Sequence, residues 1–235
     1  MVCLDLDHPE IEKFINWKVE EEDKVAALIA AGYASDYEGE AYRTVSGQNS
    51  NNSIRIPNSF FNILDEDGEW ELKGRSDGRV MKKVKARELW EQITYAAWRC
   101  ADPGTQYDST INEWHTCPAG GPIRASNPCS EYMFVDDSAC NLASLNLMKF
   151  AKEDGGLDVE KFRHAVDVVF AAQEMLVDEA SYPTPNIEKN SHAFRPIGLG
   201  YANLGALLMF NGLPYDSSEG RHYAAAITSL MHGQA

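Results

Sequence analysis

The spacing of apolar residues divides the chain into short strands and longer helices. Apolar residues dominate or alternate with polar ones at Val2–Leu6 and Ser53–Ile56, which predicts two strands. A period of three to four residues predicts helices at 7–18, 20–31 and 86–100, and a further long helix that Asp158 caps. Helix 86–100 carries its apolar side chains on one face: Leu89, Trp90, Ile93, Ala97 and Cys100. Short strands that alternate with helices are typical of an α/β protein with largely parallel strands.

Turn and charge signals predict three further elements. Asp65–Gly68 separates two apolar runs, which indicates a hairpin between residues 60–64 and 69–72. The basic segment Arg79–Arg87 has no interleaved aromatic residues, so we interpret it as a solvated helix entry rather than a phosphate-binding patch. A second helix is predicted to begin at Arg195–Gly200 and to carry Ile197, Tyr201, Leu204 and Leu208 on one face.

The pair Gly198-x-Gly200 also matches part of a dinucleotide-binding fingerprint. Asn203 stands where that fingerprint needs its third small residue, and no acidic residue follows at the required distance. Close packing of a helix therefore explains the two glycines better than nucleotide binding does.

Net charge and cysteine usage narrow the class of protein. The 36 acidic residues exceed the 21 basic ones, giving a formal charge of −15, which argues against a nucleic-acid-coating surface or an anionic membrane partner. A single nucleotide needs only a local pocket of donors and stays compatible with this charge. No apolar run approaches the roughly 18 residues of a membrane span, and no signal segment opens the chain, so we expect a cytoplasmic protein. Five unevenly spaced cysteines indicate a reducing compartment, in which any disulfide is catalytic rather than structural.

Two polar segments leave their roles open. The amide cluster Ser46–Ser53 is either a solvated loop or an amide-rich wall beside a site. His115 and Cys117 have the residue types of metal ligands, but one His-x-Cys without a second pair falls short of a zinc site. We therefore expect no metal ligands in this chain.

The segment Ser126-Asn-Pro-Cys-Ser-Glu131 places an amide, a thiol and a carboxylate at alternate positions. If it is extended, Asn127, Cys129 and Glu131 project from one face, and Pro128 stiffens the segment. An acidic turn and a returning Leu-rich limb that begins at Cys140 follow. Taken alone, the pattern favours a buried, inert Cys129 with Asn127 as a turn residue, because free cysteines are among the most buried residues.

A longer stretch of sequence around Cys129 favours a catalytic role for this thiol. Residues 127–131, followed by Cys140-Asn-Leu-Ala-Ser-Leu-Asn-Leu147, resemble the active-site finger of ribonucleotide reductases, and the wording Asn-Pro-Cys-Ser-Glu-Tyr is most similar to the adenosylcobalamin-dependent class II enzymes. The resemblance implies that Cys129 carries a transient thiyl radical that removes the ribose 3′-hydrogen. It also implies that Glu131 takes the 3′-hydroxyl proton and that Asn127 hydrogen-bonds the substrate. Cys140 would be half of the redox-active dithiol, whose partner is expected before Met1.

The chemistry explains these residue types. A sulfur radical is roughly matched in bond strength to a ribose C–H bond, so hydrogen transfer is reversible and the thiol is regenerated. Proton transfer from the 3′-hydroxyl needs a base within hydrogen-bond reach, roughly 2.6–3.2 Å between heavy atoms. Loss of water from C2′ needs two electrons, which a pair of thiols supplies by closing a disulfide.

Over residues 1–235 the resemblance implies part of the ten-stranded α/β barrel of the reductases, with a finger loop at about 124–147 inserted through its centre. It implies a ribonucleotide substrate, adenosylcobalamin as cofactor, a nucleotide effector bound largely outside this chain, and a thioredoxin-type reductant. The resemblance also implies that the full-length enzyme can form a homodimer. Because the chain opens in a strand and lacks the family's phosphate loop and its carboxy-terminal cysteine pair, we expect an internal piece that is inactive alone. In that family, Asp108 and Asn112 would lie beside the active site.

Three other functions fit parts of the sequence. A class I reductase shares the finger but receives its radical from a metal-containing subunit. A cysteine hydrolase would use Cys129 with His115, but no nucleophile elbow accompanies them. A non-catalytic binding or scaffold domain would merely bury its thiols.

Overall fold

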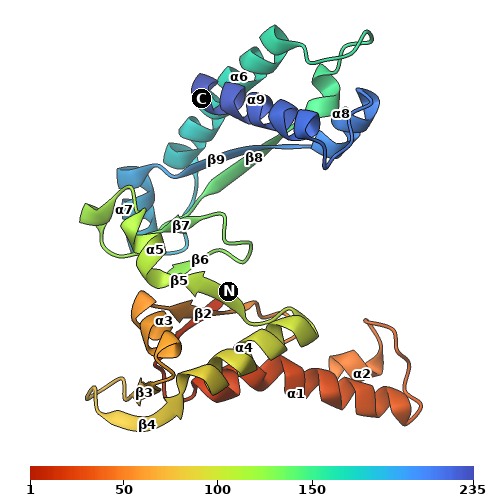
Figure 1. Cartoon of the computed structure of the whole chain (residues 1–235). Helices are drawn as coiled ribbons and strands as arrows, with labels where there is room; N and C mark the ends of the chain where they lie inside the picture. The colour runs from red at the N-terminus through yellow and green to blue at the C-terminus, as the bar shows by residue number, and fades with distance from the viewer. The chain divides into compact units, whose positions relative to one another are not determined.

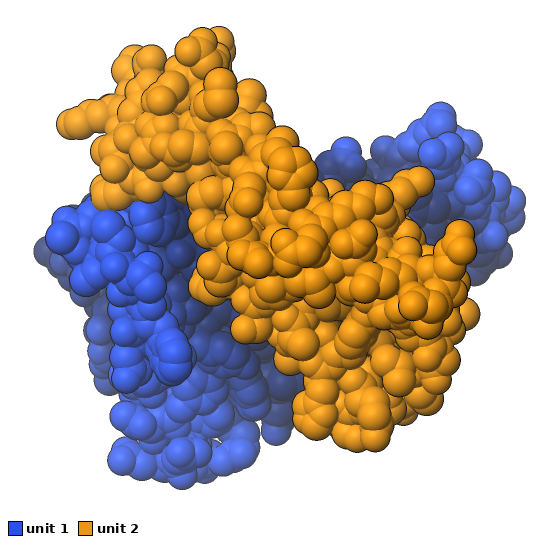
Figure 2. All heavy atoms as spheres, turned by 90° about the horizontal axis from the view of Figure 1, so that it is seen from above, with its two compact units in different colours: residues 1–136 blue, residues 137–235 orange.

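The chain forms two compact units. The computed structural model describes residues 1–235, and the units are Met1–Asp136 and Asp137–Ala235 (Figure 2). The boundary between them falls inside the segment that the sequence indicates as the finger loop.

The first unit is built on a parallel three-stranded sheet in the order β1–β2–β5, formed by β1 (Val2–Asp5), β2 (Asn52–Ile56) and β5 (Gly104–Tyr107). Alternation along β2 gives this sheet two different faces. Ile54 and Ile56 are fully buried in the apolar core, whereas Ser53 and Arg55 project from the other face and are also buried. Both strands predicted in this part of the chain are confirmed.

Helices cover the apolar face of this sheet. The core joins it to α1 (Ile11–Ala30), α3 (Asn58–Asp65) and α4 (Ala86–Cys100), and α1 and α4 lie side by side (Figure 1). The prediction of α4 is confirmed over 86–100. Two separate helices at 7–18 and 20–31 were expected, but α1 is continuous. The acidic run at its middle contains no helix breaker, and Glu21 accepts a hydrogen bond from the Ser46 N–H (2.9 Å).

An antiparallel pair, β3 (Glu69–Lys73) and β4 (Val80–Lys85), lies beside these helices. The predicted hairpin between 60–64 and 69–72 is therefore wrong, since residues 58–65 form α3. Phe60 packs edge-on against Trp70 at 5.3 Å between ring centroids, which places a helix rather than a strand against β3. The predicted helix entry at 79–87 is also wrong over most of its length. Its cations face acids across the strand pair, as in Lys83 Nζ–Glu71 Oε1 at 2.9 Å.

The second unit contains the parallel pair β8 (Asn141–Asn146) and β9 (Ile197–Ala202). The chain crosses between them through the 3-10 helix η2 (Leu147–Phe150), α6 (Val159–Glu179) and α7 (Pro185–Phe194), and then forms α8 (Leu204–Phe210) and α9 (Ser218–Gln234). Asp158 caps α6, as predicted, by accepting from the Lys161 N–H at 3.1 Å. The core between these elements includes Leu145, Leu147, Phe162, Val166, Leu207 and Ile227.

The helix predicted from residue 195 is wrong over its first half, because residues 197–202 form β9, and is confirmed over its second half, where Leu204 and Leu208 lie on α8. Gly198 is the Cα partner of Leu142, and a Cβ built on it would lie 2.4 Å from Leu142 Cδ2. The glycine therefore permits a close approach within a strand rather than within a helix. Asn203, with φ of 66°, turns the chain from β9 into α8.

The α/β class with parallel strands is confirmed in both units. None of the sheets closes on itself within this chain. No helix has the length and apolar character needed to span a membrane.

Candidate active site

The Asn-Pro-Cys-Ser-Glu motif occupies the loop of a short hairpin in the first unit. β6 (Ala125–Ser126) pairs antiparallel with β7 (Met133–Phe134), and residues 127–132 connect them. The Ser130 N–H donates to the Asn127 carbonyl (3.0 Å), and Ser130 has φ of 64°, so residues 127–130 form a tight turn. The predicted extended conformation is wrong. Asn at the first position and Pro at the second are favoured in β-turns, and these local preferences prevail over alternation.

The turn exposes the thiol and the carboxylate. Cys129 and Glu131 are exposed, whereas Asn127 is half-buried. The Asn127 Oδ1 atom accepts from the Tyr132 N–H at 3.0 Å, which leaves its Nδ2 group available to donate. The prediction that Cys129 is buried is therefore wrong for this chain.

A buried polar chain, which the sequence did not reveal, lies beneath this loop. Arg55 on β2 and Gln106 on β5 are Cα partners and are 2% and 3% exposed. Arg55 Nη1 donates to Gln106 Oε1 (3.0 Å), and Gln106 Nε2 donates to Ser126 Oγ (2.7 Å). Ser126 immediately precedes Asn127, so the chain ends at the turn. The signal that could have indicated it is a charged residue alternating with isoleucines in Ser53-Ile-Arg-Ile56.

Asp108 and Asn112, which the family resemblance singles out, hold the segment that enters the hairpin. Both lie on α5 (Asp108–Glu113). Arg55 Nη2 pairs with Asp108 Oδ1 and donates to the Ile123 carbonyl (2.7 Å). The Asn112 amide donates to the same carbonyl (3.0 Å) and accepts from the Ile123 N–H (2.9 Å). These contacts make Ile123 a fixed anchor close before β6.

Cys3 borders the same polar face from β1. Its Sγ lies 3.8 Å from Gln106 Oε1, in the geometry of a thiol donor. Burial raises the pKa of the Cys3 thiol, and the Ser126 backbone and the Arg55 charge offset only part of that effect. Cys3 is thereby kept as a neutral donor to Gln106.

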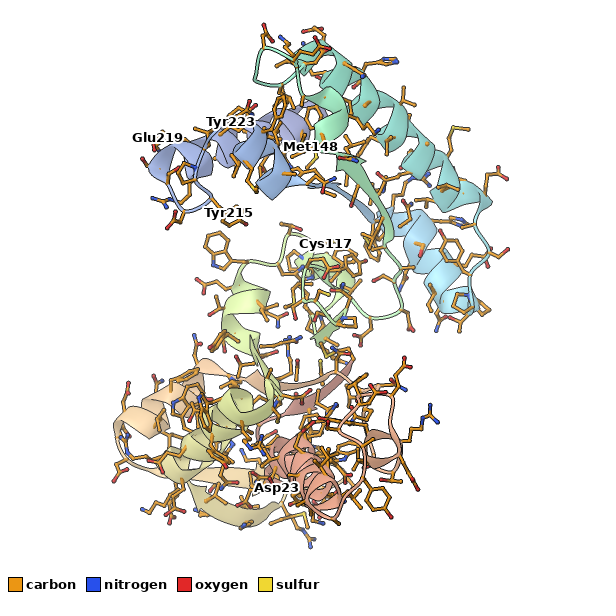
Figure 3. The ribbon with its side chains drawn as sticks, turned by 90° about the vertical axis from the view of Figure 1, so that its right-hand side faces the viewer. Asp23, Cys117, Met148, Tyr215, Glu219 and Tyr223 are labelled. Carbon is orange, nitrogen blue, oxygen red and sulfur yellow. The ribbon has the colours of Figure 1, made fainter.

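His115 is committed to its own loop. Its Nε2 lies 3.0 Å from the Gly121 carbonyl, and its Nδ1 accepts from the Cys117 N–H (3.3 Å). The 3-10 helix η1 (Pro118–Gly120) fills this loop, and Figure 3 shows Cys117 within it. With both ring nitrogens engaged, His115 lacks a free position from which to act as a base for Cys129, which counts against a cysteine hydrolase. No group of three or more His, Cys, Asp or Glu side chains is arranged around a common metal position.

The amide segment lies against α1. Trp17 Nε1 donates to Ser46 Oγ (2.9 Å), and Lys18 Nζ donates to the Ser50 carbonyl (2.8 Å). Asn52, which opens β2, is 2% exposed. The segment is therefore a docked connection rather than a freely solvated loop, and the short helix α2 (Glu40–Arg43) precedes it in the chain.

In the second unit, Cys140 directly precedes β8. It is half-buried, and a Cβ on Gly198 would lie 3.2 Å from its Sγ. Gln173, which is 3% exposed, fixes the neighbouring backbone. Its Nε2 donates to the carbonyls of Gly198 (2.9 Å) and Asn141 (3.2 Å), and Asn141 Nδ2 donates back to the Gln173 carbonyl (2.9 Å). Gln173 was not indicated by the sequence, because polar residues on a long helix are usually solvated.

Comparison with known proteins places these features in one family. The family model described as "Ribonucleotide reductase, barrel domain" matches residues 1–235. A vitamin B12-dependent ribonucleotide reductase of Streptomyces avermitilis is 52% identical over 99% of this chain, which covers 25% of that relative. The corresponding protein of Rhodopirellula baltica is 50% identical over 100% of this chain and 23% of its own length. A vitamin B12-dependent ribonucleoside-diphosphate reductase of Thermoplasma acidophilum is 28% identical over the whole chain and 28% of the relative. The chain thus spans about a quarter of the length of these curated relatives.

Proposed function

Because the chain belongs to the ribonucleotide reductase family and matches its barrel domain throughout, we propose that it contributes the catalytic finger of an enzyme that reduces ribonucleotides to 2′-deoxyribonucleotides for DNA precursor synthesis. The observation that carries this proposal is the exposed Cys129 at the tip of a buttressed turn, with Glu131 two residues away and also exposed. A reaction that begins with hydrogen transfer to sulfur requires an accessible thiol in a fixed position.

Each residue of the motif has a separate role in this proposal. Cys129, as a thiyl radical, removes the 3′-hydrogen of the ribose and later returns a hydrogen atom. Glu131 accepts the 3′-hydroxyl proton. Asn127 orients the substrate through Nδ2, because its Oδ1 is already used by the Tyr132 N–H. Cys140 is one of two thiols that supply two electrons at C2′ and end as a disulfide; its partner belongs to another part of the full-length enzyme.

We assign the protein to the adenosylcobalamin-dependent class, following the wording of the motif and the names of the relatives. Adenosylcobalamin supplies radical chemistry when it is bound. The exposed Cys129 thiol fits this chemistry because it offers a hydrogen atom at the surface of the unit. The chain's own contribution is to hold that thiol and to move the 3′-hydroxyl proton through Glu131.

The remaining partners follow from the same reaction. The substrate is a ribonucleotide, and an effector nucleotide binds largely outside this chain. A thioredoxin-type reductant restores the dithiol that contains Cys140. We place the enzyme in the cytoplasm, where such reductants act, and expect a homodimer of the full-length protein.

Replacing the thiol tests the proposal. In a full-length reductase that carries this sequence, Cys129→Ser is expected to abolish deoxyribonucleotide formation, since a hydroxyl does not form the corresponding radical. Cys117→Ser is the matched control, because Cys117 lies in the η1 loop, and should retain activity. Retention of activity by Cys129→Ser would refute the proposal and leave a scaffold function in its place.

The class I alternative is separated by the source of the radical. Class II predicts activity that requires added adenosylcobalamin, resists hydroxyurea and needs no second subunit. Activity that is independent of cobalamin and depends on a metal-containing partner subunit would assign the protein to class I instead.

A further inference from the structure

We propose that Arg55, Gln106 and Ser126 form a hydrogen-bond relay of fixed polarity that positions the Cys129 turn for hydrogen transfer. The inference rests on the proposed function of Cys129 and adds positioning residues that lie outside the finger motif. It is carried by an unbroken series of contacts from the sheet to the turn: Arg55 Nη1 to Gln106 Oε1 (3.0 Å), Gln106 Nε2 to Ser126 Oγ (2.7 Å), and Ser126 Oγ to the Asn127 carbonyl (2.8 Å).

Arg55 sets the direction of the relay. A guanidinium only donates, so the atom of Gln106 that faces it must be the carbonyl oxygen. Cys3 Sγ, 3.8 Å from the same oxygen, is also a donor and gives the same orientation. The Gln106 amino group is thereby turned toward Ser126, which must accept. The one Ser126 hydroxyl proton is then left to donate to the Asn127 carbonyl.

The relay reaches both ends of the turn. The Asn127 carbonyl that accepts from Ser126 also accepts from the Ser130 N–H, the bond that closes the turn around Cys129. Ser130 Oγ lies 3.3 Å from Ser126 Oγ and is the more distant of the two acceptors that the Ser126 hydroxyl faces. One hydroxyl therefore contacts the residues on either side of Pro128-Cys129.

The foundation of the relay is rigid. Arg55 and Gln106 are directly paired across parallel strands, and both are almost fully buried. Arg55 is held in addition by Asp108 and by the Ile123 carbonyl (2.7 Å). A buried hydrogen-bonded network on paired strands has few alternative arrangements, and through Ser126 it fixes the turn that follows.

Three variants test the polarity in a full-length reductase that carries this sequence. Gln106→Glu keeps the shape and can still accept from Arg55, but it presents an oxygen to Ser126, which must then redirect its proton away from Asn127. Ser126→Ala removes the hydroxyl, whereas Ser126→Thr keeps it. We expect Gln106→Glu and Ser126→Ala to lower kcat by about 10- to 100-fold. A displacement of a reacting atom by up to about 1 Å lowers the reaction rate by this factor. KM for the ribonucleotide should change little, and Ser126→Thr should restore most of kcat.

Thiol alkylation gives a second readout that a purely structural loss would not produce. The alkylation rate of Cys129, followed by peptide mass spectrometry, should change in Gln106→Glu and Ser126→Ala. The alkylation rate of Cys117 should stay as in the parent protein. If Gln106→Glu does not fold, the comparison of Ser126→Ala with Ser126→Thr decides.

The outcomes separate this inference from the proposed function. Normal kcat and Cys129 alkylation in Gln106→Glu and Ser126→Ala, combined with an inactive Cys129→Ser, would overturn the relay alone. An active Cys129→Ser would overturn the proposed function and with it the relay. Equal losses in Ser126→Ala and Ser126→Thr would also overturn the relay, because the hydroxyl would then have no role.

Discussion

Gly198 and Gly200, two glycines on the same strand, provide a matched test of how Cys140 is accommodated. A Cβ at Gly198 would lie 2.4 Å from Leu142 Cδ2, 3.2 Å from Cys140 Sγ and 3.7 Å from the Asn141 carbonyl. A Cβ at Gly200 would meet only Ser144 Oγ, at 3.9 Å. Gly198→Ala should therefore disturb Cys140, and Gly200→Ala should not.

The expected magnitudes follow from which neighbours can move. Leu142 is 64% exposed, so its side chain can swing into solvent at little cost. Cys140 is half-buried and must shift by a few tenths of an ångström, so we expect the lower end of the overpacking range, about 1 kcal/mol. Replacing glycine with alanine at a compatible backbone position returns about 0.4–1 kcal/mol through the unfolded chain. Gly198→Ala should thus be neutral to slightly less stable, and Gly200→Ala more stable by about 0.4–1 kcal/mol.

Urea unfolding followed by circular dichroism measures both stabilities, and alkylation of Cys140 reports the position of its thiol. We expect the Cys140 alkylation rate to change in Gly198→Ala and to match the parent in Gly200→Ala. If Gly198→Ala gained as much stability as Gly200→Ala and left the rate at Cys140 unchanged, the proposed close fit between Gly198 and the thiol would be refuted.

Three further predictions concern buried polar groups. Burial raises the pKa of Asp102, so the folded state binds its proton more tightly and the free energy of unfolding falls as pH rises from the carboxyl's ordinary pKa through the raised one. Asp102→Asn should remove this loss and be more stable at neutral pH, with no gain in acid; urea unfolding at both pH values checks it, and equal effects at both would count against it. Arg55→Leu removes the Arg55 donor from Gln106 Oε1 and from the Ile123 carbonyl, which keep only Cys3 and Asn112, and should cost roughly 1–3 kcal/mol in urea unfolding; a change well under 1 kcal/mol would show that the network is not stabilising. Gln173→Leu removes the donor to two carbonyls beside Cys140 and should cost roughly 1–3 kcal/mol and speed Cys140 alkylation, and an unchanged rate would contradict this.

Elements with a clear apolar period could be predicted from the sequence. Helix α4 begins and ends where the stripe through Leu89 and Ile93 indicates, and Asp158 caps α6 as its side-chain chemistry predicts. In both cases the decisive information is local: a buried face every three to four residues and a side chain that bonds the first turn.

Predictions of secondary structure were wrong where distant segments pair and where the chain turns. Residues 197–202 form a strand because they pair with β8, which is distant in sequence. Their two glycines do not indicate a strand locally. Residues 127–130 turn because Asn127 and Ser130 bond each other, although alternation along the motif predicts an extended segment.

The residue sequence of the motif indicated the chemistry of the finger, but it did not indicate the residues that hold the finger in place. Gln106 and Gln173 are ordinary polar residues in sequence, and only the fold shows that each donates to the backbone or hydroxyl groups next to a key cysteine. Arg55 carries the one signal that could have indicated this support, since a cation within a buried, isoleucine-rich strand requires a buried partner.

Removal of the ribose 3′-hydrogen by Cys129 can be measured with a ribonucleotide deuterated at C3′. In single-turnover reduction by a full-length reductase that carries this sequence, we predict slower deoxyribonucleotide formation from the deuterated ribonucleotide than from the normal one, and no product with Cys129→Ser. Equal rates for the two substrates, together with product formation by Cys129→Ser, would show that Cys129 does not remove the 3′-hydrogen.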